Sequence, residues 1–172
     1  MGNIRARMAA RTVVKGTDYA TRNDRWLTPL PIVRSLGTFD LDPAAAPDHP
    51  TAEECWTPEA IGDGLAMPWH GRVWLNPPYG RAQGEWIRRL LDHGSGVGLI
   101  PVAMGTRLWQ DVVMPVAPAI LFYRHRVSFL RRDGETTDDM VSPQASALVA
   151  ASDDDADALI ASGLPGIVLR MT

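Results

Sequence analysis

The chain has 172 residues, of which 45% are hydrophobic and 22% charged, and its formal net charge is −3 at pH 7. These values are typical of one globular domain, exclude a disordered chain, and leave little room for a second domain. The single cysteine, Cys55, excludes an internal disulfide framework and a multi-cysteine metal site. Because no apolar run reaches the roughly 18 residues of a membrane span and the first residues lack the apolar core of a secretory signal, we expect a cytoplasmic protein.

Basic residues are concentrated in two parts of the chain, although the negative net charge argues against a surface covered by positive potential. Residues 1–34 hold seven basic side chains against two acidic ones. A second basic cluster consists of Arg124, His125, Arg126, Arg131 and Arg132. Residues 1–24 are polar and show no hydrophobic periodicity, so we predict a flexible basic arm there and a folded domain over 25–172.

The first half of the chain predicts alternating helices and strands. Thr28 and Pro29 are a helix-start signal, in which the threonine hydroxyl caps a helix that ends at Gly37. Apolar residues alternate with acidic ones over 39–42 and predict a short strand. Residues 43–71 are rich in proline and glycine and predict mostly irregular structure, with one short helix inside it.

The second half predicts more strands than helices. Apolar strand patterns cover residues 71–75, 97–101, 119–123, 127–130, 145–151 and 167–171. One helix is expected to end at Gly94, a second to be broken by Pro115, and a third to run from a cap at Ser152 to Gly163. We interpret the acidic run 153–157 as the solvated first turn of that last helix, which the helix dipole favours.

This order of elements predicts an α/β sheet that is parallel in its first part and has antiparallel strands at one edge. In such sheets the ligand crevice lies at the carboxyl ends of the parallel strands. Asp42-Pro43 and Asn76–Tyr79 each follow a predicted strand directly. We therefore expect the functional site where these two segments meet.

Asn76-Pro77-Pro78-Tyr79 is the most specific motif in the chain. The amine of adenine is a poor nucleophile because its lone pair is delocalised into the ring. An asparagine oxygen and a main-chain carbonyl that both accept from this amine would free the lone pair for attack. The prolines stiffen the loop, and the tyrosine offers a flat face to a base swung out of the DNA helix. The alternative interpretation is a rigid turn with a core tyrosine.

At these residues the chain resembles the phage-type, Dam-like DNA N6-adenine methyltransferases. The likeness covers roughly residues 24–151 and rests on segments in matching order: Trp26-Leu27-Thr28-Pro29, 39–45, Asp63-Gly64-Leu65, 73–80, 99–101, 106–109, 126–129 and 142–148. It implies a single-domain, Rossmann-like methyltransferase fold with S-adenosylmethionine as methyl donor and DNA as partner. It also implies a phage- or prophage-encoded protein that works in the cytoplasm of a bacterial host.

The motif and the resemblance together assign roles to individual residues. The expected catalytic residues are Asn76, Pro77, Pro78 and Tyr79. The expected cofactor-binding residues are Trp26, Thr28, Pro29, Asp42, Pro43, Ala44, Asp63 and Asn76. A carboxylate at a strand end, as at Asp42, can bind the methionyl ammonium, although turns at Asp42-Pro43 and Asp63-Gly64 remain open as alternatives.

DNA contacts are expected from exposed arginines around the cleft and from the basic arm. The candidates are Arg81, Arg107, Arg124, Arg126, Arg131 and Arg132. We expect no metal site, because His49 and Cys55 are too isolated to form one, and we expect a monomer or a homodimer. Because one domain of 172 residues is expected to leave no room for a separate recognition domain, we expect a short or relaxed target sequence.

Two features depart from the expected pattern. The glycine-rich cofactor loop of most methyltransferases is missing after Asp42, as it is in the phage-type family. Ala103-Met104-Gly105-Thr106 replaces the relatives' Arg-x-Asp-Thr, and His125 stands where a glycine is usual. The preferred hypothesis is methyl transfer to adenine N6 in DNA. The alternatives are methylation of cytosine N4 or of protein glutamine, or an inactive methyltransferase fold that binds nucleic acid.

Overall fold

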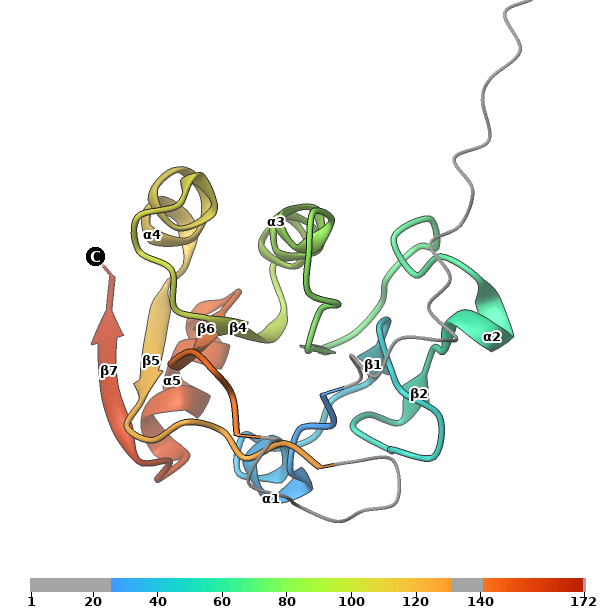
Figure 1. Cartoon of the computed structure of the whole chain (residues 1–172), viewed down its shortest axis with the longest axis horizontal. Helices are drawn as coiled ribbons and strands as arrows, with labels where there is room; N and C mark the ends of the chain where they lie inside the picture. The colour runs from blue at the N-terminus through green and yellow to red at the C-terminus, as the bar shows by residue number, and fades with distance from the viewer. Residues whose placement is uncertain (1–25, 131–140, 172) are drawn as a thin grey trace, which may run out of the picture.

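The computed structural model describes residues 26–130 and 141–171, which form one seven-stranded sheet with helices on both faces (Figure 1). The strands are β1 (Leu41–Asp42), β2 (Glu54–Cys55), β3 (Val73–Leu75), β4 (Gly96–Pro101), β5 (Ala119–Tyr123), β6 (Ser146–Ala150) and β7 (Gly166–Arg170). Their order across the sheet is β2-β1-β3-β4-β6-β5-β7. The predicted arm over residues 1–24 lies outside the described residues.

The directions of the strands determine which strand ends share the edge of the sheet where the site is expected. Strands β2, β1, β3 and β4 are parallel, whereas β6 is antiparallel to β4 and to β5, and β7 is antiparallel to β5. The predicted parallel first part and antiparallel edge are therefore confirmed. Because β5 is two antiparallel steps away from β4, it points the same way as β4. The carboxyl ends of β1, β3, β4 and β5 consequently share one edge of the sheet.

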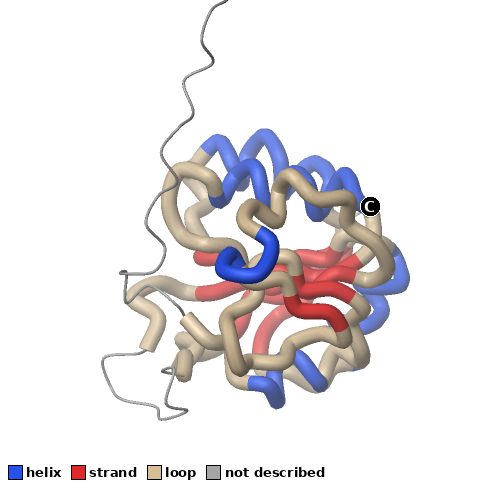
Figure 2. The backbone as a smooth tube through the Cα atoms, turned by 90° about the vertical axis from the view of Figure 1, so that its right-hand side faces the viewer, coloured by secondary structure: helices blue, strands red, loops and turns tan. Residues whose placement is uncertain are grey.

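The helices form two layers, one on each face of the sheet, and Figure 2 shows the strands between them edge-on. In chain order they are α1 (Leu30–Arg34), α2 (Pro58–Ile61), α3 (Gln83–His93), the π-helical turn η1 (Trp109–Val113), α4 (Met114–Val116) and α5 (Asp153–Ala161). Helices α3 and α4 lie on one side of the sheet, and α1 and α5 lie on the other (Figure 1).

The strands alternate their side chains between two hydrophobic cores, as a pleated strand must when both faces are covered. In β3, Val73 and Leu75 pack toward α3 and η1, whereas Trp74 packs toward α1 and α5. The side chains of all three residues are fully buried. This explains why the strands appear in the sequence as nearly continuous apolar runs.

Several predicted elements are confirmed within one or two residues. Strands β3 to β7 all lie at predicted strands, and α3 ends where Gly94 adopts a left-handed conformation at φ 73°. The N–H of Gly94 donates to the carbonyl of Leu90, which closes the helix. Ser152 caps α5 as predicted, because its hydroxyl accepts a hydrogen bond from the N–H of Asp155.

Two predictions about elements are wrong, and one strand was omitted. Pro115 does not break its helix, since it occupies the first turn of α4, where an N–H needs no intrahelical acceptor. Residues 127–130 form only two isolated bridges, Leu27 to Leu130 and Ser128 to Val141, instead of a strand. Residues 43–71 are mostly irregular and contain one short helix, α2, as predicted, but the prediction omitted β2, which pairs with β1 through backbone bonds that need no apolar pattern.

The acidic first turn of α5 is not wholly solvated, contrary to the sequence interpretation. Asp155 is 1% exposed. Its carboxylate accepts from the Nε of Arg72 at 2.7 Å, from the N–H of Gly96 at 2.6 Å and from the hydroxyl of Ser152 at 2.6 Å. Asp155 therefore joins α5 to the amino ends of β3 and β4, at the edge of the sheet opposite the site.

Candidate active site

The Asn76 side chain links two segments that are 50 residues apart in the sequence. Its Nδ2 donates to the carbonyl of Trp26 at 2.7 Å and to the hydroxyl of Thr28 at 3.2 Å. Because a carbonyl can only accept, the amide nitrogen must face Trp26 and the oxygen must point away. The Asn76 Oδ1 is buried and has no hydrogen-bond partner among the described residues. An unpaired buried acceptor costs about 1–3 kcal/mol, so this atom is prepared for a donor that arrives with a ligand.

Thr28 does not cap its helix as predicted. Pro29 occupies the N-cap position of α1, and no side chain caps the helix there. The Thr28 hydroxyl accepts from Asn76, and the Thr28 carbonyl accepts from Nε2 of His49 at 2.8 Å. The side chain that the sequence assigned to helix capping therefore holds Asn76 in place.

His49 is a site residue that the sequence reasoning missed. It is buried, and this burial lowers the pKa of its imidazole below the ordinary value, so the ring is neutral at pH 7. Since its partner is a carbonyl, Nε2 carries the proton. His49 and Thr28 are 21 residues apart, and nothing in the sequence links them.

Asp42 lies at the carboxyl end of β1 with 4% of its surface exposed. Its Oδ1 accepts from the N–H of Ala44 at 3.0 Å, and its Oδ2 accepts from the hydroxyl of Thr51. Burial raises the pKa of Asp42 to about 6, against the lowering effect of these two hydrogen bonds. The carboxylate is ionised at pH 7 and can bind a cation through its remaining lone pairs.

The Asp63-Gly64 turn packs against the loop that follows β1. A Cβ placed on Gly64 would lie 2.1 Å from the carbonyl oxygen of Pro43, so only glycine permits this approach. Asp63 is exposed, and its Oδ1 accepts from the N–H of Leu65 at 3.0 Å. This hydrogen bond forms the Asp-Gly turn that the sequence analysis kept as an alternative to a cofactor-binding role. The fold thus brings two segments predicted to bind the cofactor side by side.

Tyr79 forms the aromatic part of the site. It is partly buried, and burial raises the pKa of its phenol to about 12, so the ring is uncharged. The ring of Trp26 meets it edge-on at a centroid distance of 6.2 Å, and Trp26 itself lies edge-on to Phe129 at 5.3 Å. These contacts fix the orientation of the tyrosine ring.

A pocket of about 380 Å³ lies beside Tyr79, between the start of α3 and the segment 103–109. The segment is held by bonds from the Thr106 hydroxyl to the carbonyl of Ala103, at 2.8 Å, and from the Trp109 indole to the carbonyl of Pro101, at 3.0 Å. Of the residues predicted to bind the cofactor, none lines this pocket. The residues predicted to bind the cofactor and the residues that line the pocket therefore occupy two parts of one edge of the sheet. The segment 76–79 lies between these two parts.

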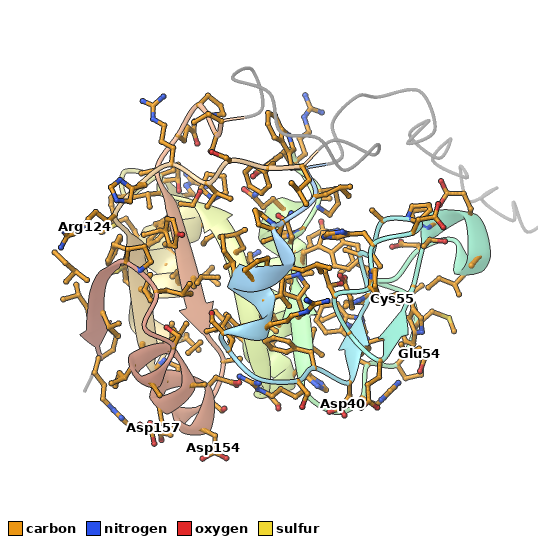
Figure 3. The ribbon with its side chains drawn as sticks, turned by 90° about the horizontal axis from the view of Figure 1, so that it is seen from below. Asp40, Glu54, Cys55, Arg124, Asp154 and Asp157 are labelled. Atoms are coloured by element: carbon orange, nitrogen blue, oxygen red, sulfur yellow. The ribbon has the colours of Figure 1, made fainter. Side chains whose placement is uncertain are left out.

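The predicted DNA-binding arginines that the structure describes are all exposed. Arg81 lines the pocket, Arg107 lies in the segment 103–109, and Arg124 and Arg126 follow the carboxyl end of β5. Figure 3 shows Arg124 well apart from Asp154 and Asp157 of the acidic α5. Arg131 and Arg132 lie outside the described residues.

Two further observations concern metals and membranes. Within residues 26–130 and 141–171, no group of three or more His, Cys, Asp or Glu side chains is placed to hold a metal ion. No helix in the same part of the chain is both long enough and apolar enough to span a membrane.

The family model of DNA N-6-adenine-methyltransferase (Dam) matches residues 16–156, which is most of the chain and includes every residue predicted to be catalytic or to bind the cofactor. No curated protein and no solved structure matches the chain. The mixed α/β sheet described above is compatible with a methyltransferase fold.

Proposed function

Because the chain belongs to the DNA N-6-adenine-methyltransferase (Dam) family, we propose that it methylates the N6 amine of adenine in DNA, with S-adenosylmethionine as methyl donor. The observation that carries this proposal is the unpaired, buried Oδ1 of Asn76 at the end of β3. An amine is the one substituent of adenine that can donate to it. The same family assignment supports a Rossmann-like topology for the sheet.

Asn76 and Pro77 prepare the amine for attack. Their side-chain and main-chain oxygens each accept one N–H of the amine, which withdraws its lone pair from the adenine ring. The bonds from Asn76 Nδ2 to Trp26 and Thr28 hold the side-chain oxygen still, and the proline rings hold the main chain. No general base is needed before attack, because the nitrogen becomes acidic only after it has taken the methyl group.

Tyr79 holds the ring of the target base. A duplex hides adenine N6 from an active site, so the base must leave the stack, and it needs a new surface on which to stack. The uncharged, oriented ring of Tyr79, which lines the pocket, supplies this surface. Stacking on an aromatic side chain contributes about 1–3 kcal/mol per base.

The residues at the ends of β1 and β3 fit the cofactor. When bound, S-adenosylmethionine would supply an electrophilic methyl group: its carbon–sulfur bond would break as the adenine nitrogen bonds to the methyl carbon, leaving a neutral thioether, and the methylated nitrogen would then release a proton to solvent. The ionised Asp42 carboxylate suits the methionyl ammonium, and the Asp63-Gly64 turn packs beside it against Pro43. The complete proposed set is Trp26, Thr28, Pro29, Asp42, Pro43, Ala44, Asp63 and Asn76.

The exposed arginines along this edge of the sheet bind phosphates. Arg81 and Arg107 are at or next to the pocket, and Arg124 and Arg126 extend the edge beyond β5. Guanidinium groups suit phosphate oxygens through paired hydrogen bonds. Arg124 lies far from Asp154 and Asp157 of the acidic α5, so a protein with a negative net charge can still offer a positive surface to DNA at this edge.

Mass spectrometry of nucleosides tests the proposal. DNA is taken from cells that express the wild type, Asn76→Ala or, as a control away from the site, Asp154→Ala. We expect N6-methyladenine with the wild type and with Asp154→Ala, and only background with Asn76→Ala. No increase with the wild type, or an equal increase with Asn76→Ala, would contradict the proposal. A rise in N4-methylcytosine instead would support the alternative base.

A further inference from the structure

The pocket beside Tyr79 has the size and walls of a site for a flat ring. Its volume of about 380 Å³ is near the lower end of the range of ligand pockets, about 300–1,000 Å³. Tyr79, Trp109, Leu108 and Pro101 supply aromatic and aliphatic walls. Polar groups on such walls determine which ring is accepted.

One polar group in this pocket has no partner. Gln83 is the first residue of α3 and lines the pocket, and its side-chain Nε2 is buried without a hydrogen-bond partner in the described part of the chain. Its backbone N–H is engaged with the carbonyl of Gly80 at 3.2 Å. The side-chain amide nitrogen is therefore a hydrogen-bond donor for which the described residues offer no acceptor.

Gln83 and Asn76, which flank Tyr79 in the sequence, carry complementary unpaired groups. Three buried side-chain nitrogen or oxygen atoms of the described residues lack partners, and two of them are the Asn76 oxygen and the Gln83 nitrogen. The third belongs to Arg72, next to β3 at the edge opposite the site. An acceptor three residues before Tyr79 and a donor on the pocket that Tyr79 lines match a heterocycle in which an amine is flanked by a ring nitrogen.

From this pair we propose that Gln83 is a specificity-determining residue, whose side-chain amide donates to a ring nitrogen flanking the target amine. The inference rests on the proposed function and deepens it. Adenine has such nitrogens at N1 and N7, on either side of N6. Guanine and thymine have a carbonyl oxygen where adenine has the amine, so they would turn an acceptor toward the acceptor of Asn76.

Nuclear magnetic resonance tests the contact without any methyl transfer. The side-chain amide signals of Gln83 are assigned as those missing from Gln83→Glu, and the protein is titrated with 2′-deoxyadenosine and with its 1-deaza and 7-deaza analogues. We expect 2′-deoxyadenosine to shift the signals and one deaza analogue to leave them in place. Equal shifts with all three nucleosides, or no shift with 2′-deoxyadenosine at its solubility limit, would overturn the proposal.

Kinetics provide a second test on duplexes that carry the methylated sequence found in expressing cells. Gln83→Leu should lower kcat/KM about tenfold on adenine, as expected for one neutral hydrogen bond in a dry pocket. The loss should vanish on the deaza substrate that lacks the accepting nitrogen. An equal loss on all three bases would contradict the contact. Gln144→Leu, at the other glutamine of the pocket, should act equally on the three bases because its side chain is exposed.

The two proposals fail separately. If 2′-deoxyadenosine shifts the Gln83 signals but cells accumulate no N6-methyladenine, the result supports the contact in the pocket and contradicts the proposed methyl transfer. If cells accumulate N6-methyladenine but Gln83→Leu and Gln83→Glu have wild-type kcat/KM, the result supports the proposed methyl transfer and contradicts the role of Gln83. Urea unfolding of both variants establishes that the folded states are being compared.

Discussion

Asp155 gives the sharpest prediction about stability. Its buried carboxylate accepts from Arg72, Gly96 and Ser152, so Asp155→Asn replaces an anion by a neutral amide among three donors. Removing one partner of a buried ion pair costs about 3–5 kcal/mol. The side chain of Arg72 is 23% exposed, so water can solvate part of the guanidinium, and we expect the lower end of this range, about 3 kcal/mol.

The assay is urea unfolding of the wild type, Asp155→Asn and Asp157→Asn. Asp157 pairs with Arg170 at 2.5 Å, but their side chains are 66% and 45% exposed, so its replacement should cost at most about 1 kcal/mol. The free energy of unfolding should therefore fall much further for Asp155→Asn, with an unchanged denaturant slope. A loss below about 1 kcal/mol for Asp155→Asn, or equal losses for both variants, would refute the reasoning.

Three further predictions concern ligand binding. Burial raises the folded-state pKa of Asp42 to about 6, so the carboxylate becomes protonated below that pH. Calorimetry should show the affinity for S-adenosylmethionine falling about tenfold per pH unit below 6, and a flat profile in Asp42→Asn would support the assignment. Gly64→Ala drives a Cβ into the carbonyl of Pro43 and should weaken the same binding by at least about tenfold, whereas Gly105→Ala, which meets nothing within 4 Å, should not; equal effects would contradict the packing argument. Arg124→Ala should weaken DNA binding and reduce the slope of log K against log salt by about 0.9, and an unchanged slope would remove it from the interface.

The same raised pKa affects stability in the opposite sense to an ordinary salt bridge. The folded state binds the Asp42 proton more tightly than the unfolded state, whose pKa is near 3.8. Stability contributed by this group is therefore complete below about pH 4 and is lost as the pH rises to about 6. Binding of a cation to the ionised carboxylate offsets this loss at neutral pH.

The strands could be predicted from the sequence because each face of the sheet is covered by helices. Val73, Trp74 and Leu75 are all buried, so their segment is apolar at every position and stands out from its surroundings. Glu54 and Cys55 form β2 at the edge of the sheet through backbone pairing alone, and no hydrophobic pattern announces them. Edge strands of two residues are beyond what side-chain periodicity can detect.

The parts of the candidate site whose residues are adjacent in the sequence could be predicted. The contacts between residues that are distant in the sequence and meet only in the fold could not. The motif around Asn76 could be recognised as a candidate site from its own composition. The engagement of the Thr28 hydroxyl by Asn76, by contrast, depends on a crossing of segments 48 residues apart. Gln83 is the plainest omission: it is an ordinary polar residue at a helix start, and only the pocket and its unpaired amide mark it.

The central claim is that the Oδ1 of Asn76 receives the amine of adenine, and isotope transfer tests it most directly. Purified protein is incubated with DNA and S-adenosylmethionine labelled in the methyl group, and the digested nucleosides are analysed by mass spectrometry. The account predicts label in N6-methyladenine and a loss of about 100-fold or more in rate for Asn76→Leu, the scale of removing one preorganised polar contact at a reacting centre. Label only in another nucleoside, or an undiminished rate with Asn76→Leu, would contradict it.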